Sequence, residues 1–75
     1  MSSLIAYKNK QPQLDPNVWI APGAHIIGDV TVGKDSGIWF NCVLRGDVMP
    51  IIIGERTNIQ DLTMIHTSDG VLPIS

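Results

Sequence analysis

Aliphatic residues recur at every sixth position over most of the chain. In the successive segments VWIAPG, AHIIGD, VTVGKD, SGIWFN and CVLRGD, which begin at Val18, the third position is always aliphatic and the first is small or β-branched. Three residues, VMP (48–50), then intervene, and the pattern resumes as IIIGER, TNIQDL, TMIHTS and DGVLPI. The aliphatic third positions are Ile20, Ile26, Val32, Ile38, Leu44, Ile53, Ile59, Ile65 and Val71.

A six-residue period fits neither an α-helix nor a simple hairpin. A 3.6-residue period drifts out of phase within two turns, and alternation alone gives no repeat of six. A coil with a short strand on each of three flat sides does give this period, with the third-position side chain and the one two places earlier both pointing inward. The corners are assigned to glycine and aspartate at Gly28, Asp29, Gly33, Asp35 and Gly54. We therefore predict an all-β fold, a parallel β-helix of hexapeptide repeats with about three coils.

The first residues of the chain do not follow this period. Residues 1–17 contain Pro12, Pro16 and several polar residues, which favour a strand and loop that lead into the first coil and cap it. Residues 18–75 form the predicted β-helix.

The spacing also predicts which polar side chains are neighbours. Residues in adjacent coils differ by about 18 positions, and by about 21 across the insertion, with coils ~4.8 Å apart. Leu44 should therefore lie next to Ile65, and Arg45 next to His66. Asp47 should lie close to this pair, and Gln60 one side earlier on the same coil as His66.

Composition excludes several classes of protein. The 75 residues carry a net charge of -2 with no run of basic residues, which argues against nucleic acid or an anionic membrane as a partner. The one cysteine, Cys42, cannot form an internal disulfide and occupies a small inward position, so we expect it in the core. No signal peptide or stretch long enough to span a membrane is recognisable, and we expect a cytoplasmic protein.

The polar residues allow both a structural and a chemical interpretation. Arg45 and Asp47 can form an ion pair worth about 0–1 kcal/mol if exposed. His66 can be a surface histidine or a metal ligand, since neutral imidazole is the commonest metal ligand. A catalytic zinc usually takes three protein ligands, and His25 falls two coils and one side away from His66, so one chain cannot close a three-histidine site.

Other polar and aromatic residues have ordinary interpretations as well. Gln60 and Asp61 are either corner residues or part of a site, and Asn58 fits a turn. The aromatic residues Trp19, Trp39 and Phe40 are interpreted as packing residues.

The run IIGDVTVGKDSGIWFNCVLRGDVMPIIIGERTNIQDLTMIHT closely resembles the gamma-class carbonic anhydrases and their bacterial relatives. Those proteins are left-handed β-helix trimers of the hexapeptide-transferase superfamily. The resemblance implies that His66 is the first of three metal-binding histidines. It also implies that Arg45 and Asp47 form a pair crossing the subunit interface beside the metal, and that Gln60 holds the metal-bound water.

The same resemblance implies the remaining features of the site. Asn58 and Asp61 fall on family residues that shape the site and anchor Arg45. The expected cofactor is a divalent metal, with zinc first and iron or cobalt as alternatives. The expected assembly is a homotrimer that converts carbon dioxide to bicarbonate. Val48 stands where the family's best-studied members carry a glutamate used in proton transfer.

Members of this family are longer and carry the other two metal histidines in later coils. We therefore expect this chain to be an N-terminal fragment that is inactive by itself. Two alternatives to a metal-dependent hydratase stay open. One is a coenzyme A-dependent acyltransferase, which would normally need a catalytic histidine in a protruding loop. The other is a non-catalytic trimeric metal-binding scaffold, which the valine at position 48 favours.

Overall fold

The computed structural model describes residues 3–66 and 72–74, and every regular element in these ranges is a β-strand. The strands are β1 (Ser3–Ile5), β2 (Gln13–Leu14), β3 (Trp19–Ile20), β4 (His25–Val32), β5 (Gly37–Ile38), β6 (Val43–Ile53), β7 (Asn58–Ile59), β8 (Met64–His66) and β9 (Leu72–Ile74). Within the described residues, no helix has the length and apolar character to cross a membrane.

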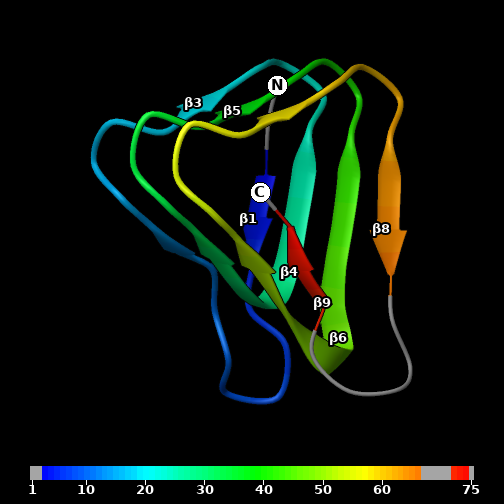
Figure 1. Ribbon diagram of the computed structural model, residues 1–75. Coiled ribbons are helices and arrows are strands. Elements are labelled where there is room, and N and C mark those ends of the chain that lie inside the picture. Colours follow the sequence, from blue (N-terminus) through cyan, green and yellow to red (C-terminus); the bar gives the residue numbers. More distant parts are fainter. Residues whose placement is uncertain (1–2, 67–71, 75) are drawn as a thin grey trace.

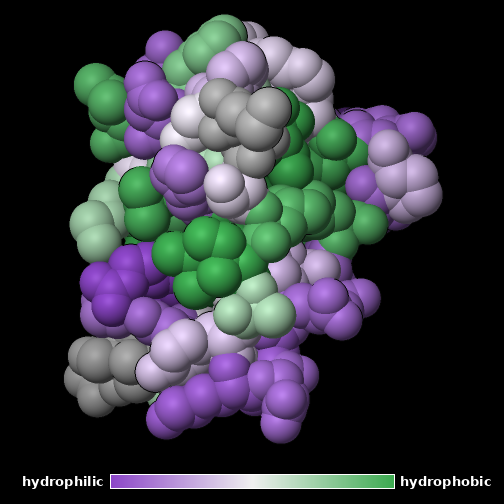
Figure 2. All heavy atoms as spheres, turned by 180° about the vertical axis from the view of Figure 1, so that it is seen from behind, coloured by the Kyte–Doolittle hydropathy of each residue, from purple (hydrophilic) through white to green (hydrophobic). Residues whose placement is uncertain are grey.

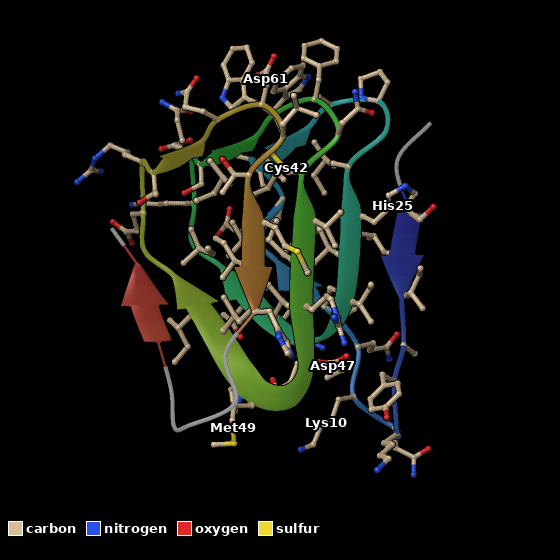
Figure 3. All side chains as sticks on the ribbon, turned by 90° about the vertical axis from the view of Figure 1, so that its right-hand side faces the viewer. Lys10, His25, Cys42, Asp47, Met49 and Asp61 are labelled. Carbon is tan, nitrogen blue, oxygen red and sulfur yellow. The ribbon has the colours of Figure 1, made fainter. Side chains whose placement is uncertain are left out.

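The strands stack as the coils of a three-sided solenoid (Figure 1). One parallel sheet has the order β1-β4-β6-β8, with β2 also paired to β4 and β9 to β6, and a second parallel sheet has the order β3-β5-β7. In Figure 1 the chain runs clockwise while later coils lie nearer the viewer, as the side view of Figure 3 also shows, so the coil is left-handed. The predicted all-β hexapeptide solenoid of about three coils is confirmed.

The strand register follows the predicted spacing as far as β8. Before the insertion, Trp19 pairs with Gly37, eighteen residues further along the chain. Across it, Arg45 pairs with His66, a separation of twenty-one. The change occurs within β6, where the pairing with β4 shifts between Gly28 and Val30. The insertion is therefore absorbed at one corner, and the inward positions keep their phase. The register departs from the prediction between β6 and β9, where Ile51 pairs with Leu72, twenty-one residues further along the chain, although the repeat predicts a separation of eighteen.

The core is formed by the two inward positions of each side. Side chains at the predicted third positions are at most 9% exposed from Ile26 to Ile65, and Ile20 is partly buried against them. Cys42 is completely buried, as predicted, and Ser36 and Thr57 are the buried polar residues in the described part of the chain. Asp69 and Val71 themselves lie outside the described residues, but Leu72 and Ile74 pair with Ile51 and Ile53 in the places predicted for Asp69 and Val71, so the predicted positions in this last repeat are wrong by three residues.

The corners use a left-handed backbone conformation that the sequence only partly indicates. One column of stacked corners contains Gly23, Asn41 and Leu62, with φ of 84°, 58° and 62°. Gly28 has φ of 77°, and a Cβ there would lie 2.6 Å from the carbonyl oxygen of Gly46 in the next coil. Glycine is therefore required at position 28 both by its φ and by the close approach of the neighbouring coil.

The residues before Val18 pair directly with the solenoid. In β1, Ser3 pairs with His25, and in β2, Gln13 pairs with Thr31. This segment therefore adds a layer of strands to the first coil, while the predicted boundary between residues 17 and 18 stays a prediction. Leu4 and Ile5 remain 54% and 43% exposed, and Figure 2 shows an apolar area bordered by polar residues on this end of the molecule.

Candidate metal centre and its polar surroundings

Asp47 joins Arg45 and His66 into one cluster at a corner of the solenoid. Arg45 and Asp47 lie on β6, and His66 ends the neighbouring strand β8, where it pairs with Arg45. Arg45 Nη2 lies 2.7 Å and Nε 3.1 Å from Asp47 Oδ2, and His66 Nε2 lies 3.3 Å from Asp47 Oδ1. The predicted proximity of these three side chains is confirmed.

The two oxygens of the Asp47 carboxylate serve different partners. Both guanidinium contacts go to Oδ2, while Oδ1 faces the imidazole of His66. A carboxylate beside one ring nitrogen is a usual outer partner of a metal-binding histidine, because it fixes the ring orientation. This arrangement leaves Nδ1 of His66 as the nitrogen that can bind a metal.

The cluster is partly exposed to solvent. The side chains of Arg45 and His66 are 38% and 33% exposed, whereas that of Asp47 is 14% exposed. The carboxylate therefore lies beneath the two nitrogen-bearing groups, and the imidazole can be reached from outside the molecule.

The other predicted site residues lie elsewhere on the same chain. Asn58 is exposed on β7, and its Oδ1 accepts a hydrogen bond of 3.2 Å from Trp39 Nε1. Gln60 and Asp61 are exposed at the corner that precedes β8. Figure 3 shows Asp61 and Asp47 at opposite ends of the wall formed by β4, β6 and β8. One chain therefore does not bring Asn58, Gln60 or Asp61 to the His66 cluster.

The anchoring of Arg45 by Asn58 and Asp61, which the family resemblance implies, stays a prediction. Within one chain, the carboxylate that holds Arg45 is that of Asp47. Asn58 is held instead by an indole that sequence reasoning assigned only to packing. Nothing in the hexapeptide pattern signals this hydrogen bond, because it depends on how far the Trp39 side chain extends along the surface.

The backbone of Gln60 is held from the preceding coil. Its carbonyl oxygen accepts hydrogen bonds from Cys42 Sγ, at 2.8 Å, and from Thr63 N, at 3.3 Å. Ser36 makes a similar contact, because its hydroxyl donates to the carbonyl oxygen of Gly54 at 2.8 Å. Small inward side chains with a hydrogen-bond donor thus bind corner carbonyl oxygens of the next coil.

One chain provides too few ligands for a complete metal site. Among the described residues, no three His, Cys, Asp or Glu side chains are grouped closely enough to hold a metal ion. His25 pairs with Val43, which pairs in turn with Met64. His25 therefore lies two coils away from β8, as predicted, but on the same side of the solenoid and not one side away. A metal bound by His66 would therefore need further ligands from outside the described residues.

Comparison with known proteins gives consistent matches. The family model "Bacterial transferase hexapeptide (six repeats)" matches residues 12–46. The chain is 53% identical over 60 residues to gamma carbonic anhydrase 2, mitochondrial, of Arabidopsis thaliana, covering 80% of this chain and 22% of that protein. It is 50% identical over 62 residues to the carbonic anhydrase of Geobacillus kaustophilus, covering 83% and 34%.

The solved structures agree with the fold. A hexapeptide transferase family protein from Anaplasma phagocytophilum has a TM-score of 0.86 and 50% sequence identity, covering 93% of this chain and 42% of that chain. The chain spans about a fifth to a third of the length of the two carbonic anhydrases that it matches.

Proposed function

Because this chain belongs to the hexapeptide-repeat family, together with proteins named gamma carbonic anhydrase, we propose that it supplies the first histidine of a metal-dependent carbon dioxide hydratase. The observation that carries the proposal is the Asp47 carboxylate placed between Arg45 and His66. A surface histidine needs no such support, whereas a metal ligand gains a fixed ring orientation from it.

The chain's own residues have separate roles in this reaction. His66 holds the metal, Asp47 fixes the imidazole ring, and Arg45 balances the carboxylate charge. When bound, a divalent metal supplies the Lewis acid that makes water a nucleophile near neutral pH. Zinc is the proposed metal, with iron or cobalt as alternatives, because imidazole suits each of them.

Gln60 orients the attacking water through its side-chain amide. A carbon–oxygen bond forms between this water and carbon dioxide, one proton passes to solvent, and bicarbonate leaves. The backbone of Gln60 is held by Cys42 and Thr63, so its side chain extends from a fixed point on the corner. Val48 provides no ionisable group for the proton transfer that a glutamate performs in relatives.

A trimer would bring the two halves of this site together. His66 lies at the end of β8, and Gln60 and Asp61 lie at the corner before its start. In a closed ring of identical chains, each interface joins one surface of a chain to a different surface of the next. We propose that the His66 corner of one chain faces the Gln60 corner of its neighbour, with Asn58 and Asp61 beside it.

The test uses a hybrid protein in which residues 1–66 replace the matching segment of the Geobacillus kaustophilus carbonic anhydrase. Bound metal is measured by elemental analysis, and carbon dioxide hydration by stopped-flow spectroscopy. We expect metal binding and activity in the hybrid, and loss of both in His66→Ala. Met64→Ala is the matched control, because Met64 lies on the same strand, is 59% exposed and is not a metal ligand.

Two outcomes would contradict the proposal. Full metal occupancy in His66→Ala would exclude His66 as a ligand. Acetyl transfer from acetyl-coenzyme A without hydration would favour the acyltransferase alternative, which the name of the matching family model also supports.

A further inference from the structure

Trp39, Asn58 and Gly37 form a single packed unit on the outer face of β5 and β7. The indole Nε1 of Trp39 donates a hydrogen bond to Asn58 Oδ1 at 3.2 Å. A Cβ at Gly37 would lie 2.9 Å from Asn58 Oδ1 and 3.1 Å from Trp39 Nε1. Both side chains therefore lie directly over Gly37, and a larger residue at that position would displace them.

The indole of Trp39 is itself held in place by other rings. Its centroid lies 4.8 Å from that of Trp19 in an edge-to-face arrangement and 6.4 Å from that of Phe40. Trp39 also packs against the buried core as a partly buried residue. The donor that reaches Asn58 thus comes from a rigid group, which fixes its partner more firmly than a mobile side chain would.

An indole N–H can only donate a hydrogen bond, so it determines which end of the Asn58 amide faces it. The carbonyl oxygen of Asn58 turns toward Trp39, and the NH2 group turns away. We propose that Trp39 is a positioning residue that orients Asn58 so that its amide donates to an acceptor oxygen at the site. This inference rests on the proposed function, in which bicarbonate and water supply such oxygens.

The orientation is tested first by NMR on the 75-residue chain. Hydrogen exchange of the Trp39 indole N–H should be slower in the unsubstituted chain than in Asn58→Ala by roughly 2- to 10-fold, the range expected for one hydrogen bond. Trp39→Phe should shift the side-chain NH2 resonances of Asn58. Trp19→Phe is the matched control, because Trp19 belongs to the same ring cluster and should leave those resonances in place.

The consequence for catalysis is tested in the hybrid enzyme. Trp39→Phe should lower kcat/KM for carbon dioxide by roughly 2- to 10-fold, again the range for one hydrogen bond, while bound metal and melting temperature stay equal to those of Trp19→Phe. Asn58→Asp, which keeps the acceptor for Trp39 and loses the outward donor, should lower kcat/KM at least as much.

The two experiments separate this inference from the proposed function. Equal indole exchange in the unsubstituted chain and Asn58→Ala would overturn the inference, as would unchanged kcat/KM in Trp39→Phe. An inactive unsubstituted hybrid with the expected NMR result would instead overturn the proposed function and leave the Trp39–Asn58 pairing established.

Discussion

Asp47 is more buried than either of the two side chains that it joins. Its partners are each about one-third exposed, so water screens the Arg45–Asp47 attraction and limits its value for folding. The pair therefore does more to orient His66 than to stabilise the coil. The structural role of Asp47, as the partner of Arg45, can therefore be tested separately from its role in orienting His66.

Replacing Asp47 should therefore affect metal binding more than folding. We expect Asp47→Asn to lower the free energy of unfolding by no more than about 1 kcal/mol, as for an exposed ion pair. Metal affinity of the hybrid enzyme should fall by roughly 10- to 100-fold, as when the outer partner of a ligand is removed. Urea unfolding and metal titration measure the two effects.

Glu55→Gln is the control for charge alone. Glu55 Oε1 lies 3.8 Å from Arg56 Nη1, and both side chains are more than half exposed. Glu55→Gln should change neither the free energy of unfolding nor the metal affinity. A loss of stability in Asp47→Asn of several kcal/mol, with metal affinity unchanged, would assign Asp47 a structural role only.

Leu62 combines a left-handed backbone conformation with an exposed apolar side chain. Its φ is 62°, its side chain is 77% exposed, and the same column of corners carries Gly23 and Asn41. A leucine in this conformation costs roughly 1–2 kcal/mol, which asparagine largely avoids. We expect Leu62→Asn to raise the free energy of unfolding by about 1 kcal/mol, measured by urea unfolding.

Leu62→Ala distinguishes backbone strain from side-chain exposure. Alanine keeps the unfavourable φ and removes the exposed leucine, so stability should change little. If Leu62→Ala stabilises the chain as much as Leu62→Asn does, the exposed side chain and not the backbone is responsible.

At the scale of the element, β4 and β6 leave no room for a side chain at Gly46, next to the register shift between these strands. A Cβ at Gly46 would lie 2.5 Å from the carbonyl oxygen of Asp29 and 2.7 Å from its carbonyl carbon. These are backbone atoms, which cannot move aside without separating the strands. The glycine of the LRGD segment is therefore required by packing between coils.

Gly46→Ala should consequently destabilise the solenoid. The expected loss is about 1–3 kcal/mol, the usual cost of overpacking, measured by thermal or urea unfolding. Thr31→Ala on β4 is the control, since Thr31 is exposed and its replacement should leave stability nearly unchanged. If Gly46→Ala and Thr31→Ala had equal unfolding midpoints, the two strands could separate at Gly46 without loss of stability.

Most of the element pattern could be predicted because coil geometry dictates it. Inward positions must be apolar, so Ile26, Leu44 and Ile65 reveal the period, and the three-residue insertion reveals the change of register. The left-handed corner at Leu62 could not be predicted, because leucine rarely adopts that φ and only the stacking of corners imposes it.

The candidate site was predictable only where strand register determines it. Arg45 and His66 are adjacent because their strands pair, and Asp47 follows on the same face. The contact between Trp39 and Asn58 depends on side-chain reach across neighbouring coils, which spacing along the chain does not describe. Asn58, Gln60 and Asp61 would reach the His66 corner only across an interface, which one sequence cannot place.

At the scale of the whole molecule, burial declines toward the last complete coil. Ile38 and Leu44 in the middle coil are completely buried, whereas Ile59 and Ile65 above them are 6% and 9% exposed. In solenoids each coil is stabilised by its neighbours, so a coil with fewer neighbours opens more readily. Within the described residues, the strand that carries His66 is paired on one side and the strand that carries Arg45 on both, so we expect the former to open more readily.

Amide hydrogen exchange should show this difference directly. We expect the amide of Leu44 in β6 to exchange more slowly than that of Ile65 in β8, because β6 is paired on both sides with β4 and β8. Addition of zinc to the hybrid enzyme should slow exchange in β8 more than in β6. Equal exchange rates in the two strands would indicate that the described coils open as a single unit.

The three additional residues between Asp47 and Ile51 make this corner a natural place for length polymorphism. The corner accommodates these residues, and the inward apolar positions stay in register before and after it. The chain can therefore be lengthened or shortened here at little cost to folding. The same corner borders the carboxylate of Asp47, so such changes would alter the surroundings of Asp47 and His66 while the solenoid stays constant. The length of this corner can therefore vary during evolution while the strand pairing of the solenoid is kept.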